Sequence, residues 1–115
     1  MNKLTLTERV SLNKVETIIG KISAVDSEIP LGQIKFLIAV AKNEGSSLRE
    51  ISGQCDLLMG TASRYMANLM FIPKYRQQAG VSLIHAYDNP VDRRQKVIVL
   101  TPAGKTFVED LIKGV

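Results

Sequence analysis

Two β-rich runs in the second half of the chain, VSLIHAY and QKVIVL, are separated only by the turn-forming stretch DNPVDRR. Asn, Pro and Asp favour a tight reversal, and the flanking runs hold the β-branched and aromatic residues that strands prefer. This pattern predicts an antiparallel hairpin within residues 81–100, with arginines at its tip. Both runs carry apolar residues at both parities, so the pattern leaves open which face packs inward.

The chain before the hairpin has helical periodicity. An N-terminal helix is predicted within residues 1–27, and the stretch SEIP ends it. Its wide apolar stripe consists of Leu12, Val15, Ile18, Ile19, Ile22 and Val25. A stripe that begins outside the central helices favours a dimer interface somewhat over burial in the chain's own core.

Residues 31–70 predict three further helices. The first covers about Leu31–Asn43, and Gly45 just past its end is typical of a helix C-terminus. Its expected buried stripe is Ile34, Leu37, Ile38 and Ala41. Ser47 and Glu50 have the spacing of a capping box, which begins the next helix. The expected inner face of that helix is Leu48, Ile51 and Cys55.

Asp56 is the predicted left-handed residue of a tight turn between this helix and the next. The following helix begins near Met59 or Gly60. Its inward face is Ala62, Met66 and Leu69, helped by Tyr65, and its outward face is Thr61, Ser63, Arg64 and Asn68. After the hairpin, Thr101 caps a helix over residues 102–114 with Pro102 at its first position. The apolar side of that helix is Phe107, Val108, Leu111 and Ile112.

This order of elements predicts one domain over residues 1–115 with a winged helix-turn-helix fold, mainly α with a small β-hairpin wing. Such a fold suits double-stranded DNA. A helix fits the major groove, where Arg commonly reads guanine, and an arginine at a hairpin tip suits the narrow minor groove. We therefore expect Thr61, Ser63, Arg64 and Asn68, together with the wing arginines Arg93 and Arg94, to contact DNA.

The distribution of charge agrees with a polyanionic partner. Residues 1–56 hold seven Lys/Arg and seven Asp/Glu, whereas residues 57–115 hold eight and four, so the second half carries the net charge of +4. Solubility alone is the other explanation of a charge of this size.

Several classes of function are not expected. The chain has one Cys, Cys55, and one His, His85, and its carboxylates are scattered. We therefore expect no metal site, cofactor or enzyme activity, and an inert buried thiol at Cys55. No apolar run reaches the roughly 20 residues of a membrane helix, and the charged N-terminal stretch is unlike a signal peptide. A cytoplasmic location is expected.

The strings IKFLIAVAKNEGSSLREISGQCDLLMGTASRYMANL and NPVDRRQKVIVLTPAG resemble the MarR family of bacterial winged-helix transcriptional regulators. The wing string, DRR before a strand and then LTPAG opening a helix, carries most of this resemblance. It implies a homodimer that binds a pseudo-palindromic operator on the bacterial nucleoid, usually as a repressor. It also implies site residues: Thr61, Ser63 and Arg64 in the major groove, Arg94 in the minor groove oriented by Asp92, and Arg93, Lys96 and Ser47 on phosphates.

Three features depart from the family pattern. The stretch MFIPKYRQQAGV lengthens the connection before the wing and adds Lys74 and Arg76 as phosphate contacts. The family ends in two longer helices that build the dimer, whereas this chain has only AGKTFVEDLIKGV after the wing. The reduced interface argues against a small-molecule effector, whose pocket in the family lies nearby. A compact regulator of a phage or plasmid type fits these departures.

Two other functions remain open from the sequence. The winged helix could be a protein–protein interaction module whose basic hairpin docks on an acidic partner. It could also bind DNA for replication initiation or partition rather than for transcription.

Overall fold

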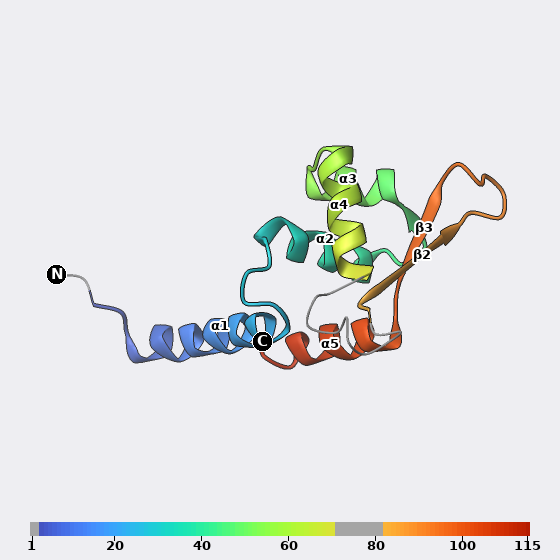
Figure 1. Cartoon of the computed structure of the whole chain (residues 1–115). Coiled ribbons are helices and arrows are strands. Elements are labelled where there is room, and N and C mark those ends of the chain that lie inside the picture. The colour runs from blue at the N-terminus through green and yellow to red at the C-terminus, as the bar shows by residue number, and fades with distance from the viewer. Residues whose placement is uncertain (1–2, 71–81) are drawn as a thin grey trace.

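The chain folds into helices packed around a small antiparallel sheet, as seen in the computed structural model, which describes residues 3–70 and 82–115 (Figure 1). The elements in chain order are α1 (Leu6–Val25), α2 (Leu31–Lys42), β1 (Ser46–Ser47), α3 (Leu48–Cys55), α4 (Met59–Met70), β2 (Ile84–Asp88), β3 (Lys96–Leu100) and α5 (Pro102–Ile112). The sheet has the strand order β1-β3-β2. The predicted winged helix-turn-helix fold is confirmed.

Helix α2 lies at the centre of the fold and contacts α3, α4, β3 and α5. Phe36, Leu37 and Val40 on this helix are fully buried. The sequence also predicted that Ile38 would be buried, which is wrong, because its side chain is 44% exposed. The large ring of Phe36 lies in the core, and this turns Ile38 toward solvent.

The predicted capping box at the start of α3 is confirmed. Ser47 Oγ accepts a hydrogen bond from the Glu50 amide at 3.2 Å, and Glu50 Oε1 accepts one from the Ser47 amide at 3.2 Å. Asp56 ends α3 with φ 56° and ψ 44°, the left-handed conformation expected of it. Ser52 Oγ then donates to the Leu57 carbonyl at 2.6 Å. These local bonds set the tight turn between α3 and α4.

The register of the wing determines which of its faces packs inward. Ile84 pairs with Leu100, and Ala86 pairs with Ile98. Ile84 and Ile98 are fully buried, whereas His85, on the other face of β2, is exposed. The core face of the hairpin is therefore the one that holds Ile84, Ala86, Ile98 and Leu100.

Strand β1 was not predicted from the sequence. Ser46 and Ser47 pair with Ile98 and Val97 of β3, and two serines carry no strand signal of their own. Gly45 was expected to cap α2, but its backbone instead extends the pairing of β1 with β3. It has φ 89°, and its amide donates to the Ile98 carbonyl at 2.8 Å. The C-cap residue of α2 is Asn43, which follows its last residue, Lys42.

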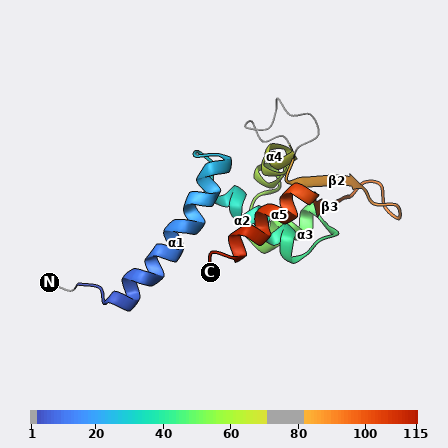
Figure 2. The same cartoon turned by 90° about the horizontal axis from the view of Figure 1, so that it is seen from below.

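Helix α1 extends away from the body of the protein, as Figure 2 shows. Val25 is its only buried residue. Its C-terminal part contacts α5, where Lys21 Nζ donates to the Asp110 carbonyl at 2.7 Å and lies 3.2 Å from Asp110 Oδ1. The exposed apolar side chains of this helix are Leu6 (72%), Val10 (49%), Leu12 (46%), Val15 (48%) and Ile19 (56%).

Helix α5 is fixed to the start of the wing. Thr101 Oγ1 caps it by accepting from the Gly104 amide at 2.9 Å, and Pro102 is its first residue, both as predicted. The Thr101 amide donates to the Leu83 carbonyl at 3.1 Å. The helix ends at Ile112 rather than at residue 114. Ile112 was expected on the apolar side, which is wrong, because it is 64% exposed; its neighbour Leu111 is the buried residue at this end of α5, and the next residue lies about a quarter turn further round the helix.

Gly104→Ala should destabilise the fold. A Cβ at this residue would lie 2.8 Å from the Leu83 carbonyl carbon and closer still to its oxygen, and neither is a flexible side chain. We expect the free energy of unfolding to fall by about 1–3 kcal/mol, a typical cost of overpacking, as measured by urea denaturation.

Gly53→Ala is the matched control, because nothing lies within 4 Å of the added Cβ in α3. Alanine is the better helix former there, so this variant should gain about 0.5–1 kcal/mol. Equal stability of the two variants would contradict the tight contact at Gly104.

Candidate nucleic-acid interface

The outer face of α4 presents small polar side chains and one arginine. Ala62 and Leu69 are fully buried, and they fix the rotation of the helix about its own axis. Ser63 and Arg64 are consequently exposed, and Thr61 is half-buried. These three of the predicted base-contacting residues lie on an accessible face of a helix that can enter a major groove.

Asn68 is also exposed, but its amide is already engaged within the chain. Asn68 Nδ2 donates to Gln33 Oε1 at 3.1 Å, and Gln33 on α2 is only 4% exposed. Sequence reasoning did not identify Gln33, because a lone polar residue next to a run of apolar ones carries no signal of its partner. In this structure the predicted DNA contact Asn68 joins α4 to α2.

The tip of the wing is ordered by a network of short-range bonds. Asn89 Oδ1 accepts from the Val91 amide at 2.9 Å, and the Asn89 amide donates to the Gln95 carbonyl at 3.0 Å. The Gln95 amide donates to the Asp92 carbonyl at 3.1 Å. These hydrogen bonds fix the backbone conformation of the turn that carries Arg93 and Arg94.

Arg94 extends from that turn into solvent. Asp92 Oδ1 accepts from the Arg94 amide at 3.1 Å and from Arg94 Nε at 3.2 Å, while the Arg94 side chain is 91% exposed. The structure thus contains the ion pair that was expected to orient Arg94. Arg93 is also exposed, and it forms no ion pair with another described residue.

Lys96 lies at the start of β3 and is paired across the hairpin. Its Nζ is 2.6 Å from Asp88 Oδ1, and both side chains are about half exposed, at 51% and 57%. An ion pair this exposed is weak, so it leaves Lys96 able to exchange its partner for another anion.

A hollow of about 420 Å³ lies between the start of α3, the start of α4 and the turn of the wing with the first residue of β3. It brings Ser47 together with Arg94 and Lys96, which were predicted separately. It also contains Arg49, which sequence reasoning missed. The position of Arg49, two residues after the helix cap Ser47, was the available signal. The lining residues are Ser47, Leu48, Arg49, Met59, Asp92, Arg94, Gln95 and Lys96.

Lys74 and Arg76, the other two predicted phosphate contacts, lie outside the described residues.

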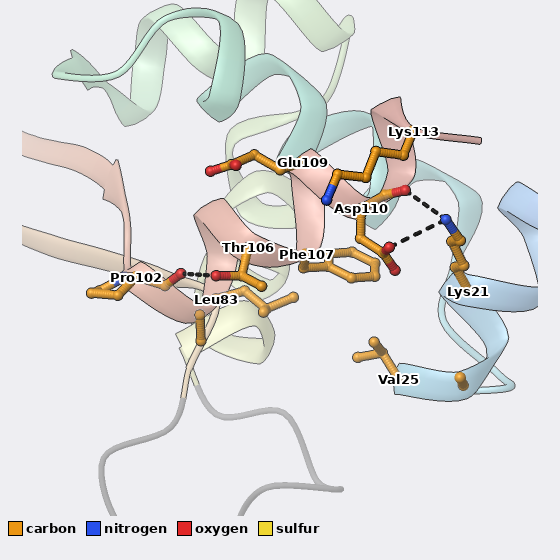
Figure 3. A pocket seen from close by; sticks show the side chains of 11 residues that line it. Lys21, Val25, Leu83, Pro102, Thr106, Phe107, Glu109, Asp110 and Lys113 are labelled. Carbon is orange, nitrogen blue, oxygen red and sulfur yellow. Dashed lines mark hydrogen bonds and ion pairs between the residues drawn. The ribbon is translucent and has the colours of Figure 1, made fainter. Parts of the chain in front are cut away.

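A larger hollow of about 740 Å³ lies between the C-terminal part of α1 and α5 (Figure 3). Val25, Leu83 and Phe107 give it apolar walls, and the Lys21–Asp110 ion pair lies at one side. The expectation that this chain has no effector stays a prediction, since a hollow does not by itself identify a ligand.

The single cysteine, Cys55, and the single histidine, His85, are not among the residues that line these two hollows. Cys55 is 4% exposed, and burial raises the pKa of its thiol, with a smaller opposing effect of Lys35. His85 stacks on Tyr87, with ring centroids 6.0 Å apart. Within residues 3–70 and 82–115, no group of three or more His, Cys, Asp or Glu is arranged to hold a metal ion.

None of the described helices combines the length and hydropathy needed to cross a membrane.

Solved structures match nearly the whole chain. The S. aureus MepR–DNA complex aligns with a TM-score of 0.72 and 22% identity, covering 95% of this chain and 81% of that one. A crystal structure of MarR aligns with a TM-score of 0.61 and 14% identity, covering 96% and 75%. Bordetella bronchiseptica BpsR, whose DNA binding is regulated by 6-hydroxynicotinic acid, aligns with a TM-score of 0.59 and 20% identity, covering 96% and 78%.

No protein-family model matches the chain. No curated protein matches it by sequence.

The sheet order, the capped turn between α3 and α4, and the hairpin that follows define a winged helix-turn-helix domain. More particularly, the chain has the fold of the MarR-type transcriptional regulators, over almost all of its length.

Proposed function

We propose that this protein is a transcriptional regulator that binds double-stranded DNA sequence-specifically. The observation that carries the proposal is the hollow that contains Arg49, Arg94 and Lys96, called the cationic hollow below; it lies between the first residues of α3 and α4 and the turn of the wing. The outer face of α4 is exposed as well. When a helix enters a major groove and a hairpin enters the adjacent minor groove, one phosphate backbone must pass between them. The hollow lies between the start of α4 and the wing, where it offers Arg49 and Lys96 to that backbone.

Within this proposal the exposed residues divide into two roles. Thr61, Ser63 and Arg64 contact base edges in the major groove, and Arg94 enters the minor groove from its Asp92-bound position. The residues proposed to hold phosphates are Ser47, Arg49, Arg93 and Lys96, with Lys74 and Arg76 from the segment before the wing. The crystal structure of MepR with this fold is a complex with DNA, which supports the same use of the fold here.

The proposal includes a homodimer formed through α1. The projecting part of this helix exposes Leu12, Val15 and Ile19 on one face, each about half exposed. Near its C-terminal end, Ile19 and Ile22 line an apolar hollow of about 300 Å³ with Leu31 of α2. Monomeric proteins seldom expose apolar side chains in such a continuous row, so a second copy of the chain is the proposed cover.

Repression by occlusion follows from this arrangement. Two recognition helices related by a twofold axis would occupy successive major grooves, with a wing in each flanking minor groove. A dimer bound in this way over a promoter would exclude the polymerase.

Arg49→Ala should weaken binding to all DNA sequences alike. If Arg49 holds a phosphate, its loss removes one charge contact, and the slope of log affinity against log salt should become shallower by about one. Base preference should not change, because a phosphate contact carries no sequence information. Binding titrations at several salt concentrations, on one preferred and one unrelated duplex, measure both quantities.

Lys105→Ala is the control for this experiment. Lys105 is exposed on α5, a helix that lies on the opposite side of the domain from α3 (Figure 1). It should leave the salt slope unaltered. If Arg49→Ala behaved like Lys105→Ala, the phosphate would not lie in the hollow.

Ile19→Glu should convert a dimer into a folded monomer. Ile19 is 56% exposed in one chain, so the fold tolerates a charge there, whereas an interface would have to bury that charge without a partner. Sedimentation velocity should give the mass of two chains for the native protein and of one chain for the variant. Leu58→Glu, at an 80% exposed leucine in the turn between α3 and α4, should remain dimeric. A dimer that survives Ile19→Glu would exclude this face of α1 as the interface.

A further inference from the structure

Helix α4 is held against the first turn of α2 by two neighbouring contacts. The ring of Tyr65 lies so close to Gly32 that a Cβ at residue 32 would be 3.0 Å from Tyr65 Cε2 and 3.1 Å from its Oη. The next residue of α2, Gln33, accepts the hydrogen bond from Asn68. Tyr65 and Asn68 are three residues apart and so lie on one side of α4. The two contacts together fix how α4 is rotated toward the surface.

The same tyrosine ring contacts the exposed arginine of α4. Arg64 Cζ lies 5.8 Å from the centroid of the Tyr65 ring, within the range at which the electron-rich face of an aromatic ring attracts a cation. Among the described residues Arg64 forms no ion pair. Among the described residues, the Tyr65 ring is therefore the group that interacts with the Arg64 guanidinium.

We propose that Tyr65 is a positioning residue for base recognition, which directs Arg64 toward its base pair. This inference rests on the proposed function, in which Arg64 reads a base. A long arginine side chain loses conformational freedom when it binds, and a contact that already restricts the free side chain reduces that loss. The benefit is specific to Arg64 and does not involve the phosphate contacts.

The test measures how strongly each variant discriminates between duplexes. A preferred duplex is first selected from a randomised library with the native protein. Affinities are then measured for that duplex and for duplexes altered at one base pair at a time. Arg64→Ala identifies the base pair whose identity Arg64 reads. The affinity ratio at that base pair is the readout, and because it compares two duplexes for one protein sample, a loss of folded protein cancels from it.

Tyr65→Leu, which keeps an apolar side chain but removes the ring, should reduce that ratio by about two- to fivefold and leave the other base pairs and the salt slope unchanged. The double variant Arg64→Ala/Tyr65→Leu should discriminate no worse than Arg64→Ala alone, because a positioning residue has nothing left to position. Tyr65→Phe keeps the ring and should retain the native ratio.

An unchanged ratio for Tyr65→Leu would overturn the inference while leaving sequence-specific binding intact. Further loss of discrimination in the double variant would also overturn it, because Tyr65 would then act through the fold in general. If Arg64→Ala changed no base preference, there would be no arginine readout for Tyr65 to position. Only the failure to select any preferred duplex with the native protein would reject the proposed function itself.

Discussion

The geometry of the proposed interface depends on the pairing of β1 with β3. Ser47 has two roles in this contact: it pairs with Val97 in the sheet, and its hydroxyl caps α3 through Glu50. One residue therefore joins the helix-turn-helix to the wing. Because both attachments use the backbone or a short side chain, the first turn of α3 and the first residues of β3 have a fixed separation. The cationic hollow lies in that separation, so its shape follows from a contact of only two residue pairs.

The two ends of the fold differ in how completely one chain buries its own apolar side chains. On the inner face of α2 the apolar side chains Phe36, Leu37 and Val40 are fully buried, and no buried side-chain nitrogen or oxygen of the described residues lacks a hydrogen-bond partner. Along α1 the opposite holds, since its apolar residues meet solvent over most of the helix and its described attachment to α5 is the Lys21–Asp110 pair and nearby packing. The self-contained packing around α2 and the exposed apolar face of α1 fit the proposed dimer, in which a second copy of the chain covers α1.

The parts of the fold that were predictable from the sequence are those encoded by adjacent residues. The capping box of Ser47, the left-handed Asp56 and the cap of α5 at Thr101 each depend on hydrogen bonds within a few positions. The contacts that were missed join distant segments. Gln33 and Asn68 are 35 positions apart, and neither residue type indicates the other. Ile38 was misplaced for a similar reason, because periodicity gives the apolar stripe of a helix but not the direction from which its neighbours approach.

Whether α4 and the wing read a specific DNA sequence is tested most directly by one selection. Fragments of the source genome are passed over the native protein at physiological salt, and the same fragments over an Arg64→Ala/Arg94→Ala double variant. We predict that the native protein retains fragments sharing a short inverted repeat at a promoter and that the double variant does not. Retention of no common sequence, or of the same fragments by both proteins, would contradict sequence-specific reading by these two elements.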